Sequence, residues 1–121
     1  ARGRASHPWL GVSGLDITPG LARTLSLPVK EGVMIAQVAP GGPAARAGLR
    51  GSQRRARVGN FMLTVGGDII VALDGQKIAG VDDLTAFLDE QKKAGDDVRV
   101  DVLHDDKPVS VVVKLGELPE S

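Results

Sequence analysis

Cysteine is absent from this sequence of 121 residues, and histidine occurs only twice. Without cysteine the chain has no disulfide, no thiolate nucleophile and no thiolate ligand for zinc. The two histidines, His7 and His104, lie far apart in the sequence, and the pairs of neighbouring aspartates do not follow the spacing of a calcium-binding loop. The sequence therefore predicts no metal site and no cofactor.

Net charge and long apolar runs are lacking as well. Fifteen lysines and arginines balance fifteen aspartates and glutamates, so no overall field favours nucleic acid or a membrane surface. No apolar run approaches the roughly 18 residues of a membrane-spanning helix. Aromatic residues are limited to Trp9, Phe61 and Phe87, whereas 42% of the chain is hydrophobic. We therefore expect one small domain with an aliphatic core.

Recognisable catalytic motifs are also missing. There is no Gly-x-Ser-x-Gly nucleophile elbow. Ser6 is next to His7 in the sequence, which does not create the geometry of a triad. Asp105 and Asp106, which follow His104, are most simply solvated loop charges. We predict that this chain is not an enzyme by itself.

Hydrophobic periodicity and turn residues predict a mainly β member of the α+β class. The pattern indicates five to seven short strands capped by two helices, with an additional half-turn, in a small, partly open barrel or sandwich. The last helix has Asp82 and Asp83 in its first turn and Lys92 and Lys93 in its last, which matches the helix dipole. We expect strands at 9–15, 33–38, 68–73, 76–78, 98–103 and 109–115, and helical segments from Pro19 to before Pro28, at 44–49 and at 81–94.

The segment 50–66 differs from the rest of the chain in composition. It contains four arginines and no acidic residue, and a run of apolar side chains follows them. Gly59-Asn60 is a two-residue turn of the kind that closes a hairpin, so we predict a hairpin with arms near 54–58 and 61–65. The arginines form a candidate anion-binding or docking patch: Arg50, Arg54, Arg55 and Arg57.

The stretch from Trp9 to Val12 is the candidate binding element. Gly11 lacks a Cβ, so another chain can approach its backbone closely. The successive amides of Leu10, Gly11 and Val12 could point into one concavity and bind a carboxylate through the main chain alone. The strand that follows would offer an open edge to an extended peptide, although an ordinary strand start is the other interpretation. The residues of this pairing edge are Val12, Ser13, Gly14 and Leu15.

Four motifs follow one another along the chain: Trp9-Leu10-Gly11-Val12, the stretch from Val38 to Leu49, the stretch from Gly67-Asp68 to Asp74-Gly75, and the helix at 81–94. In this order they resemble the binding loop, small helix, glycine-aspartate strand and groove helix of a PDZ domain. The resemblance is to the HtrA/Deg type, which is attached to trypsin-like serine proteases and has a permuted strand order. Segment 50–66 departs from the family, which commonly has only a few residues there. The resemblance divides the chain into a linker at 1–8, a PDZ domain at 9–116 with 50–66 as an inserted hairpin, and a tail at 117–121.

The resemblance implies that an apolar C-terminus, or an exposed extended segment, lies antiparallel to Val12–Leu15 in a groove beside the helix at 81–94. The amides of Leu10, Gly11 and Val12 would hold its carboxylate. Val81 cannot form a hydrogen bond with its side chain, so it would favour an apolar residue at the third position from the peptide's end. The resemblance assigns to the pocket Leu10, Val12, Val81, Thr85 and Leu88.

The resemblance also implies that the chain is a fragment of a bacterial serine endopeptidase of protein quality control, in the periplasm or cell envelope. Its partners would be peptide or protein C-termini, the protease domain of the parent chain and further copies of the parent, with no nucleic acid. The arginine-rich segment leaves three alternatives open. Its arginines could simply form a solvated face of a protruding hairpin. The segment could instead bind anions, including a membrane surface, or dock on a protease domain or a neighbouring subunit.

Overall fold

The computed structural model describes residues 7–117, and most of its regular structure is β. The predicted linker and tail fall largely outside these residues. The main sheet contains β2 (Val12–Ile17), β3 (Gly32–Val38), β6 (Ile69–Leu73), β7 (Gln76–Lys77), β8 (Asp97–His104) and β9 (Lys107–Lys114). Their order is β2-β3-β6-β8-β9, with β7 paired to β6, and all of these pairings are antiparallel. The first strand of the sheet is therefore an edge strand.

Two strand pairs lie outside the main sheet. β1 (Pro8–Trp9) pairs with β10 (Gly116–Glu117), which brings the two ends of the described chain together. β4 (Arg54–Val58) pairs with β5 (Phe61–Val65), and Gly59 in the turn between them has a φ of +63°. The predicted hairpin is therefore confirmed.

Three helices accompany the sheets in residues 7–117: α1 (Pro19–Thr24), α2 (Pro43–Arg46) and α3 (Val81–Gln91). The sequence predicted two helices and a half-turn. The half-turn forms a third, short helix, α2. The predicted mainly β fold class is confirmed, but the sheets are open and do not close into a barrel. The strands are divided among three separate sheets, and no pairing of β2 with β9 is recorded in the described part of the chain.

Local sequence signals account for several element ends. The Oγ1 of Thr18 accepts a hydrogen bond from the Leu21 amide at 3.1 Å, and Pro19 follows at the first helical position of α1. β8 and β9 are joined by Asp105 and Asp106, which have positive φ values of 50° and 65°. This two-residue turn is therefore tighter than the interval between the strands predicted at 98–103 and 109–115.

The helix α3 ends at Gln91 rather than near 94. Lys92 is extended, with φ −133° and ψ 161°, so Lys92 and Lys93 lie beyond the helix and not in its last turn. The Nζ of Lys92 forms an ion pair with Asp74 and donates a hydrogen bond to the carbonyl of Asp97 at 2.9 Å. Lys92 is thus bound to two residues outside the helix, and the next residue, Lys93, starts a turn in which its amide donates a hydrogen bond to Asp96 Oδ2 at 2.9 Å.

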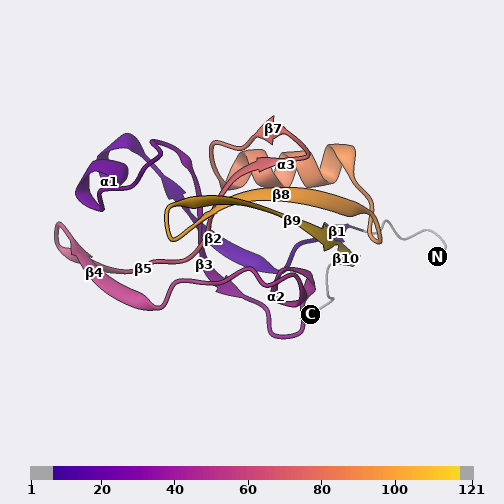
Figure 1. Ribbon diagram of the computed structural model, residues 1–121, viewed down its shortest axis with the longest axis horizontal. Helices are drawn as coiled ribbons and strands as arrows, with labels where there is room; N and C mark the ends of the chain where they lie inside the picture. Colours follow the sequence, from indigo (N-terminus) through magenta and orange to yellow (C-terminus); the bar gives the residue numbers. More distant parts are fainter. Residues whose placement is uncertain (1–6, 118–121) are drawn as a thin grey trace.

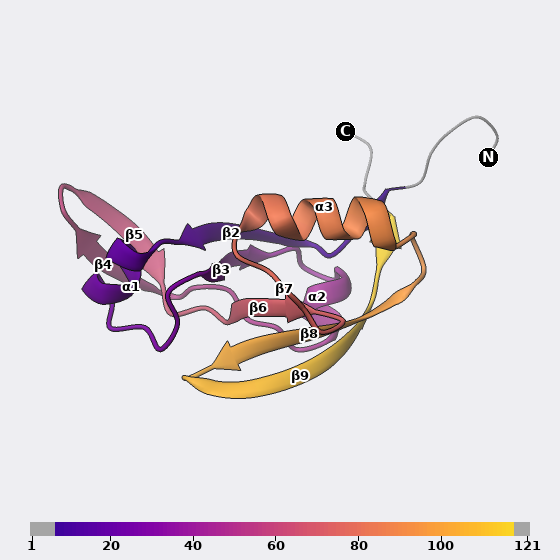
Figure 2. The ribbon, with the colours of Figure 1, turned by 90° about the horizontal axis from the view of Figure 1, so that it is seen from above.

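The core is aliphatic, as predicted, and it has two parts. The larger part packs α3 against the main sheet and includes Ile35, Phe87 and Val98. The smaller part includes Met34 and Val65 and lies toward α1 and the hairpin. Figures 1 and 2 show α1 and the hairpin at one end of the molecule and the β1–β10 pair at the other. No helix in the described residues is both long enough and apolar enough to span a membrane.

Candidate functional site

A cavity of about 300 Å³ lies between the start of β2 and the helix α3. Figure 2 shows α3 running alongside β2, which is the edge strand of the main sheet. We refer to this cavity, together with the outer edge of β2 beside it, as the groove. The cavity is lined by His7, Pro8, Trp9, Leu10, Gly11, Val12, Leu84, Thr85, Leu88 and Asp89.

The main chain at the start of the groove turns its carbonyls toward α2 and toward the residue that follows β3. The Leu10 carbonyl accepts a hydrogen bond from the Ala44 amide at 3.0 Å, and the Gly11 carbonyl accepts one from the Ala39 amide at 2.8 Å. In a trans peptide the carbonyl and the following N–H point in opposite directions. The N–H groups of Gly11 and Val12 therefore point away from these partners. Among the described residues, no acceptor is recorded for the Leu10 or Gly11 amide.

The outer edge of β2 also presents main-chain groups. Val12 pairs with Val38 of β3, and the bond from the Ala39 amide to the Gly11 carbonyl lies just outside that pair. This is the pattern of a non-hydrogen-bonded pair in an antiparallel ladder, so the N–H and C=O of Val12 face away from β3. They are directed toward the position that an added strand would take.

The Trp9 ring lies against three glycines at the start of the groove. A Cβ on Gly11, Gly42 or Gly116 would lie 3.6, 3.4 or 3.6 Å from an atom of this ring. Gly11 also has a φ of +82°, which other residues adopt only with strain, and its Cβ would lie 3.2 Å from Cδ of Pro43. Trp9 thus links β1, the loop before β2 and the start of α2.

The structure brings most of the predicted pocket residues together. Leu10, Gly11, Val12, Thr85 and Leu88 line the cavity, and the side chains of Leu10 and Leu88 are buried. The pocket is therefore apolar at its base, whereas Thr85 is exposed at its rim.

Val81 does not line this cavity. Its side chain packs at the margin of the larger core, and its amide donates a hydrogen bond to Asp16 Oδ1 at 2.7 Å. Leu84 and Asp89, which the sequence did not single out as site residues, do line the cavity. Leu84 precedes Leu88 by one helical turn, so the i,i+4 spacing was a usable signal for it.

The helix that forms one wall of the groove is held at both ends. Its first amide, that of Val81, is bound by Asp16 of β2, and beyond its last turn Lys92 pairs with Asp74. Asp74 Oδ1 also accepts a hydrogen bond from the Arg99 amide at 2.8 Å. The hydrogen bond from Lys92 is the largest cause that lowers the pKa of Asp74 below its ordinary value of 3.8. The distance between α3 and the sheet is thus set by specific contacts.

The arginine-rich hairpin has two different faces. The register sets Ala56 opposite Leu63 on a face that packs toward the smaller core, and residues alternate between faces along each strand. Arg55 and Arg57 consequently occupy the outer face and are exposed. At the tip, 73% of Phe61 is exposed. Within residues 7–117 no ion pair is recorded for the four arginines of the candidate patch, which are Arg50, Arg54, Arg55 and Arg57.

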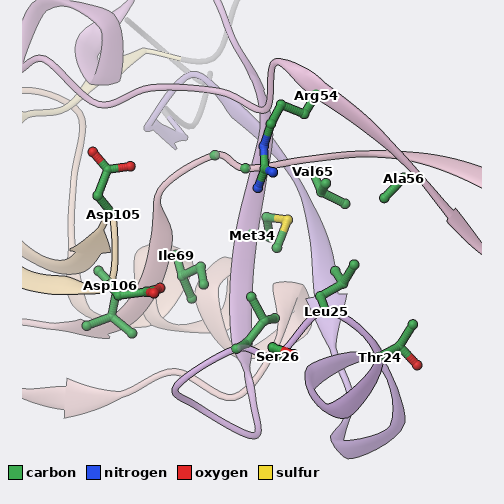
Figure 3. A pocket seen from close by; sticks show the side chains of 14 residues that line it. Thr24, Leu25, Ser26, Met34, Arg54, Ala56, Val65, Ile69, Asp105 and Asp106 are labelled. Atoms are coloured by element: carbon green, nitrogen blue, oxygen red, sulfur yellow. The ribbon is translucent and has the colours of Figure 1, made fainter.

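A second cavity, of about 490 Å³, lies between α1, the hairpin and the β8–β9 turn (Figure 3). Met34 and Ile69 contribute apolar surface to it, Arg54 enters from the hairpin, and Asp105 and Asp106 lie on the other side. The two cavities share no lining residue. The hairpin therefore takes no part in the cavity beside α3.

The base of the hairpin is fixed to β3. Ser52 Oγ donates a hydrogen bond to the Ile35 carbonyl at 2.8 Å and accepts one from the Gly67 amide at 3.1 Å. The Ser52 amide donates to the Ala36 carbonyl at 3.0 Å. A Cβ on Gly67 would lie 2.1 Å from the Ile35 carbonyl oxygen, so only glycine permits this approach. The orientation of the hairpin is thus fixed where it leaves the main sheet.

Comparison with known families decides what kind of domain this is. The family model described as "PDZ domain" matches residues 8–115. The chain belongs to the PDZ domain family. The sequence resemblance implied a groove between an edge strand and a helix, with a glycine-containing loop at one end.

Relatives of this PDZ domain are proteases of the DegP/HtrA type. It is 31% identical over 118 residues to a "Probable periplasmic serine endoprotease DegP-like" of Pseudomonas fluorescens, covering 98% of this chain and 21% of that protein. It is 39% identical over 90 residues to "Protease Do-like 1, chloroplastic" of Arabidopsis thaliana, covering 74% of this chain and 19% of that protein. The PDZ domain thus spans about a fifth of the length of these relatives.

Solved structures agree with this family. The structure titled "HtrA-type protease AlgW with decapeptide" superposes with a TM-score of 0.74 at 26% identity, covering 99% of this chain and 32% of that one. "HtrA-type protease AlgW with tripeptide" superposes with a TM-score of 0.72 at 27% identity, covering 98% of this chain and 34% of that one. The fold is therefore that of the PDZ domains of HtrA-type proteases.

Proposed function

We propose that this PDZ domain binds apolar peptide C-termini by adding the peptide as a strand to the outer edge of β2. The amides of Leu10, Gly11 and Val12 hold the terminal carboxylate, and the peptide pairs with Val12–Leu15. The observation that carries the proposal is the hydrogen bonding of the Leu10 carbonyl to the Ala44 amide and of the Gly11 carbonyl to the Ala39 amide. These bonds turn the N–H groups of Gly11 and Val12 the opposite way. Such a row of main-chain donors is suited to an anion.

The side-chain pocket gives this proposal its specificity. Leu10, Val12 and Leu88 receive the last side chain of the peptide, and an apolar residue fits their surface. Val81 offers no side-chain hydrogen bond, so the third residue from the peptide's end is apolar rather than Ser or Thr. Main-chain pairing with one or two small pockets corresponds to a dissociation constant of about 1 μM, or about −8 kcal/mol.

We further propose that the domain belongs to a larger serine endopeptidase of the periplasm or cell envelope, in which it recognises substrates and regulates or assembles the enzyme. The names of the relatives support this, since several are called periplasmic serine endoproteases. The two related HtrA-type structures named above carry a decapeptide and a tripeptide by their titles, which supports peptides as ligands. The partners are then protein C-termini, the protease domain of the parent and other copies of the parent.

Trp9 provides the test, because it is the single tryptophan and lines the cavity. Apolar-ended peptides are titrated while its fluorescence is followed, each as a free acid and as the matched C-terminal amide. We expect the amide to bind at least about tenfold more weakly, a loss of about 1.4 kcal/mol. Equal binding of acid and amide would exclude the carboxylate site, and no binding of either would exclude the groove as a peptide site.

A second candidate function is docking through the hairpin on an acidic surface of a protease domain or neighbouring subunit. The exposed Arg55 and Arg57 and the exposed Phe61 favour it, since an apolar tip flanked by cations suits a protein surface with acidic residues. The test is the double variant Arg55→Glu/Arg57→Glu in the parent protein. Docking predicts altered assembly or proteolysis with unchanged peptide affinity, whereas loss of binding to anionic vesicles alone would indicate a membrane contact instead.

A further inference from the structure

We propose that two copies of this chain pair through the outer edges of their β9 strands, related by a twofold axis. In this pairing the turn between β8 and β9 of each copy lies against Arg46 and Lys114 of the other copy. β2 lies at the opposite edge of the main sheet, so the groove stays open to a peptide. The inference thus concerns a surface that the proposed peptide binding does not use.

β9 is the second edge strand of the main sheet, and the register shows which of its main-chain groups point outward. In the described part of the chain β9 pairs only with β8. The two-residue turn before Lys107 makes the Lys107 amide donate back to β8. The Leu115 amide, just beyond the end of β9, points the same way, since it donates to the Asp96 carbonyl at 2.8 Å. Every second residue from Lys107 onward therefore faces β8.

The residues between them turn their main chain to the free edge. Ser110, Val112 and Lys114 each present an N–H and a C=O there, and no partner on that side is recorded within residues 7–117. Pro108 occupies the first outward position, where its missing N–H costs the β8–β9 ladder nothing. The edge thus offers successive donors and acceptors to a further strand.

β9 also carries exposed apolar side chains. Val109 is 40% exposed and Val112 is 64% exposed, and they lie on opposite faces of the sheet. Among the described residues, the other large apolar side chains with such exposure are Phe61 and Met62 of the hairpin. A strand added to β9 would cover both valines, one on each face.

A third cavity, of about 510 Å³, lies beside the C-terminal end of β9, between this strand and α2. Arg46 of α2 and Lys114 of β9 line it, and Trp9 contributes apolar surface. Glu117 is the acidic residue of the lining, so two cations lie near one carboxylate. Figure 2 shows β9 along the margin of the sheet, on the side opposite α3. The cavity is therefore suited to an acidic side chain that arrives at this margin.

The acidic residues of a second copy reach this place in one register. With Ser110 opposite Ser110 of the other copy, Asp106 of each copy lies opposite Lys114 of the other. Within one copy these two charges lie about 25 Å apart along an extended strand, so they do not pair there. Asp105, which is 85% exposed, lies next to Asp106 and adds a second negative charge beside Arg46. Moving the pairing by two residues in either direction would separate Asp106 from Lys114.

The same register brings apolar residues together. Val109 lies opposite Val111, and Val112 lies opposite Pro108, so both exposed valines are covered. One strand pair buries less than about 1,200 Å², the lower limit of a standard interface. We therefore expect a weak dimer, with a dissociation constant of about 0.1–1 mM.

Sedimentation equilibrium of the chain from about 10 μM to about 2 mM tests this inference. Ser110→Pro removes the central donor of the pairing but no bond of the β8–β9 ladder, and it should weaken the dimer at least about tenfold. Ser110→Ala is the matched control. It loses the same hydroxyl, which donates to Asp101 Oδ1 at 2.6 Å, but keeps the N–H, so its dimerisation should stay within about twofold.

A charge exchange tests the register. Asp106→Lys and Lys114→Glu should each weaken the dimer about fivefold, because each sets like charges opposite one another. The double variant Asp106→Lys/Lys114→Glu should recover most of the loss, since its two charges meet only between copies. Urea unfolding of each variant checks the fold, because Asp97 lies opposite Lys114 in the β8–β9 ladder.

Three outcomes would overturn the inference. The first is a monomer at every concentration. The second is equal dimerisation of Ser110→Pro and Ser110→Ala, which would place the contact on another surface such as the hairpin. The third is a double variant as weak as the two single ones. Should Ser110→Pro fail to fold, the unmodified chain and the charge exchange still decide, and the titration followed by Trp9 fluorescence tests the groove separately.

Discussion

The imidazole of His104 lies 2.6 Å from the carboxylate of Asp68, measured from Nδ1 to Oδ1. Only 4% of Asp68 is exposed, and its second oxygen accepts a hydrogen bond from the Arg50 amide at 3.1 Å. The sequence pointed only to Asp105 and Asp106 as neighbours of His104. The pair of His104 and Asp68 joins the end of β8 to the base of the hairpin, and so it has a structural role in the fold.

Replacing His104 by alanine is expected to destabilise the domain by about 1–3 kcal/mol, because it removes a partner from a buried carboxylate. Urea unfolding measures this loss. Asp105→Asn is the matched control, since the Asp105 side chain is 85% exposed and its Oδ2 lies 3.6 Å from the other ring nitrogen. A change in His104→Ala as small as in the control would show that the pair contributes nothing to stability.

Gly11→Ala is expected to weaken peptide binding by at least about tenfold. With φ at +82° and Pro43 Cδ 3.2 Å from the new Cβ, the loop must move, and the amides of Gly11 and Val12 turn with it. The left-handed conformation also costs about 1–2 kcal/mol of stability. Binding is measured by Trp9 fluorescence and stability by urea unfolding.

Gly48→Ala separates the two effects. Gly48 has a φ of +91°, and no atom lies within 4 Å of the position that an added Cβ would take, so the variant carries the same backbone strain away from the groove. It should lose a similar amount of stability with unchanged affinity for peptides. Equal affinity in both variants would argue against a role of the Gly11 loop in binding.

The sequence predicted those features that depend on neighbouring residues. Gly59-Asn60 specifies the hairpin turn, and Thr18 with Pro19 specifies the start of α1, because a turn and a cap use residues within one or two turns of chain. The predicted loop and pocket residues, except Val81, also lie together, but Leu10 and Leu88 are far apart in the sequence, and only the resemblance to PDZ domains placed them in one pocket.

Features that depend on distant residues were not predictable in the same way. The ion pair of Lys92 with Asp74 joins residues 18 positions apart, and no local pattern indicates it. Asp16 contacts Val81 across 65 positions of sequence. The sheets are open because the strands pair within three separate sheets. The alternation of apolar and polar residues within one strand does not specify which strand it pairs with.

Asp74 is expected to make the stability of the domain dependent on pH in the acid range. Its pKa is lowered in the folded state, chiefly by the hydrogen bond from Lys92. The folded state therefore gains stability from the ionised form above the unfolded value of 3.8, and loses it as the pH falls through the lower folded pKa. In Asp74→Asn this contribution is absent. The difference in melting temperature between the two proteins should thus shrink as the pH falls below about 4, and a constant difference would contradict the assignment.

Ser52→Ala is expected to loosen the hairpin without affecting the groove. The variant removes the hydroxyl that donates to the Ile35 carbonyl and accepts from the Gly67 amide, two bonds that fix the hairpin base to β3. Global stability should fall by about 1–2 kcal/mol, and hydrogen exchange of the β4 and β5 amides should accelerate more than that of β8. Peptide affinity should stay within about twofold, because the two cavities share no residue. If exchange accelerated equally in β8, Ser52 would support the whole domain, and the hairpin would not be a separately anchored docking element.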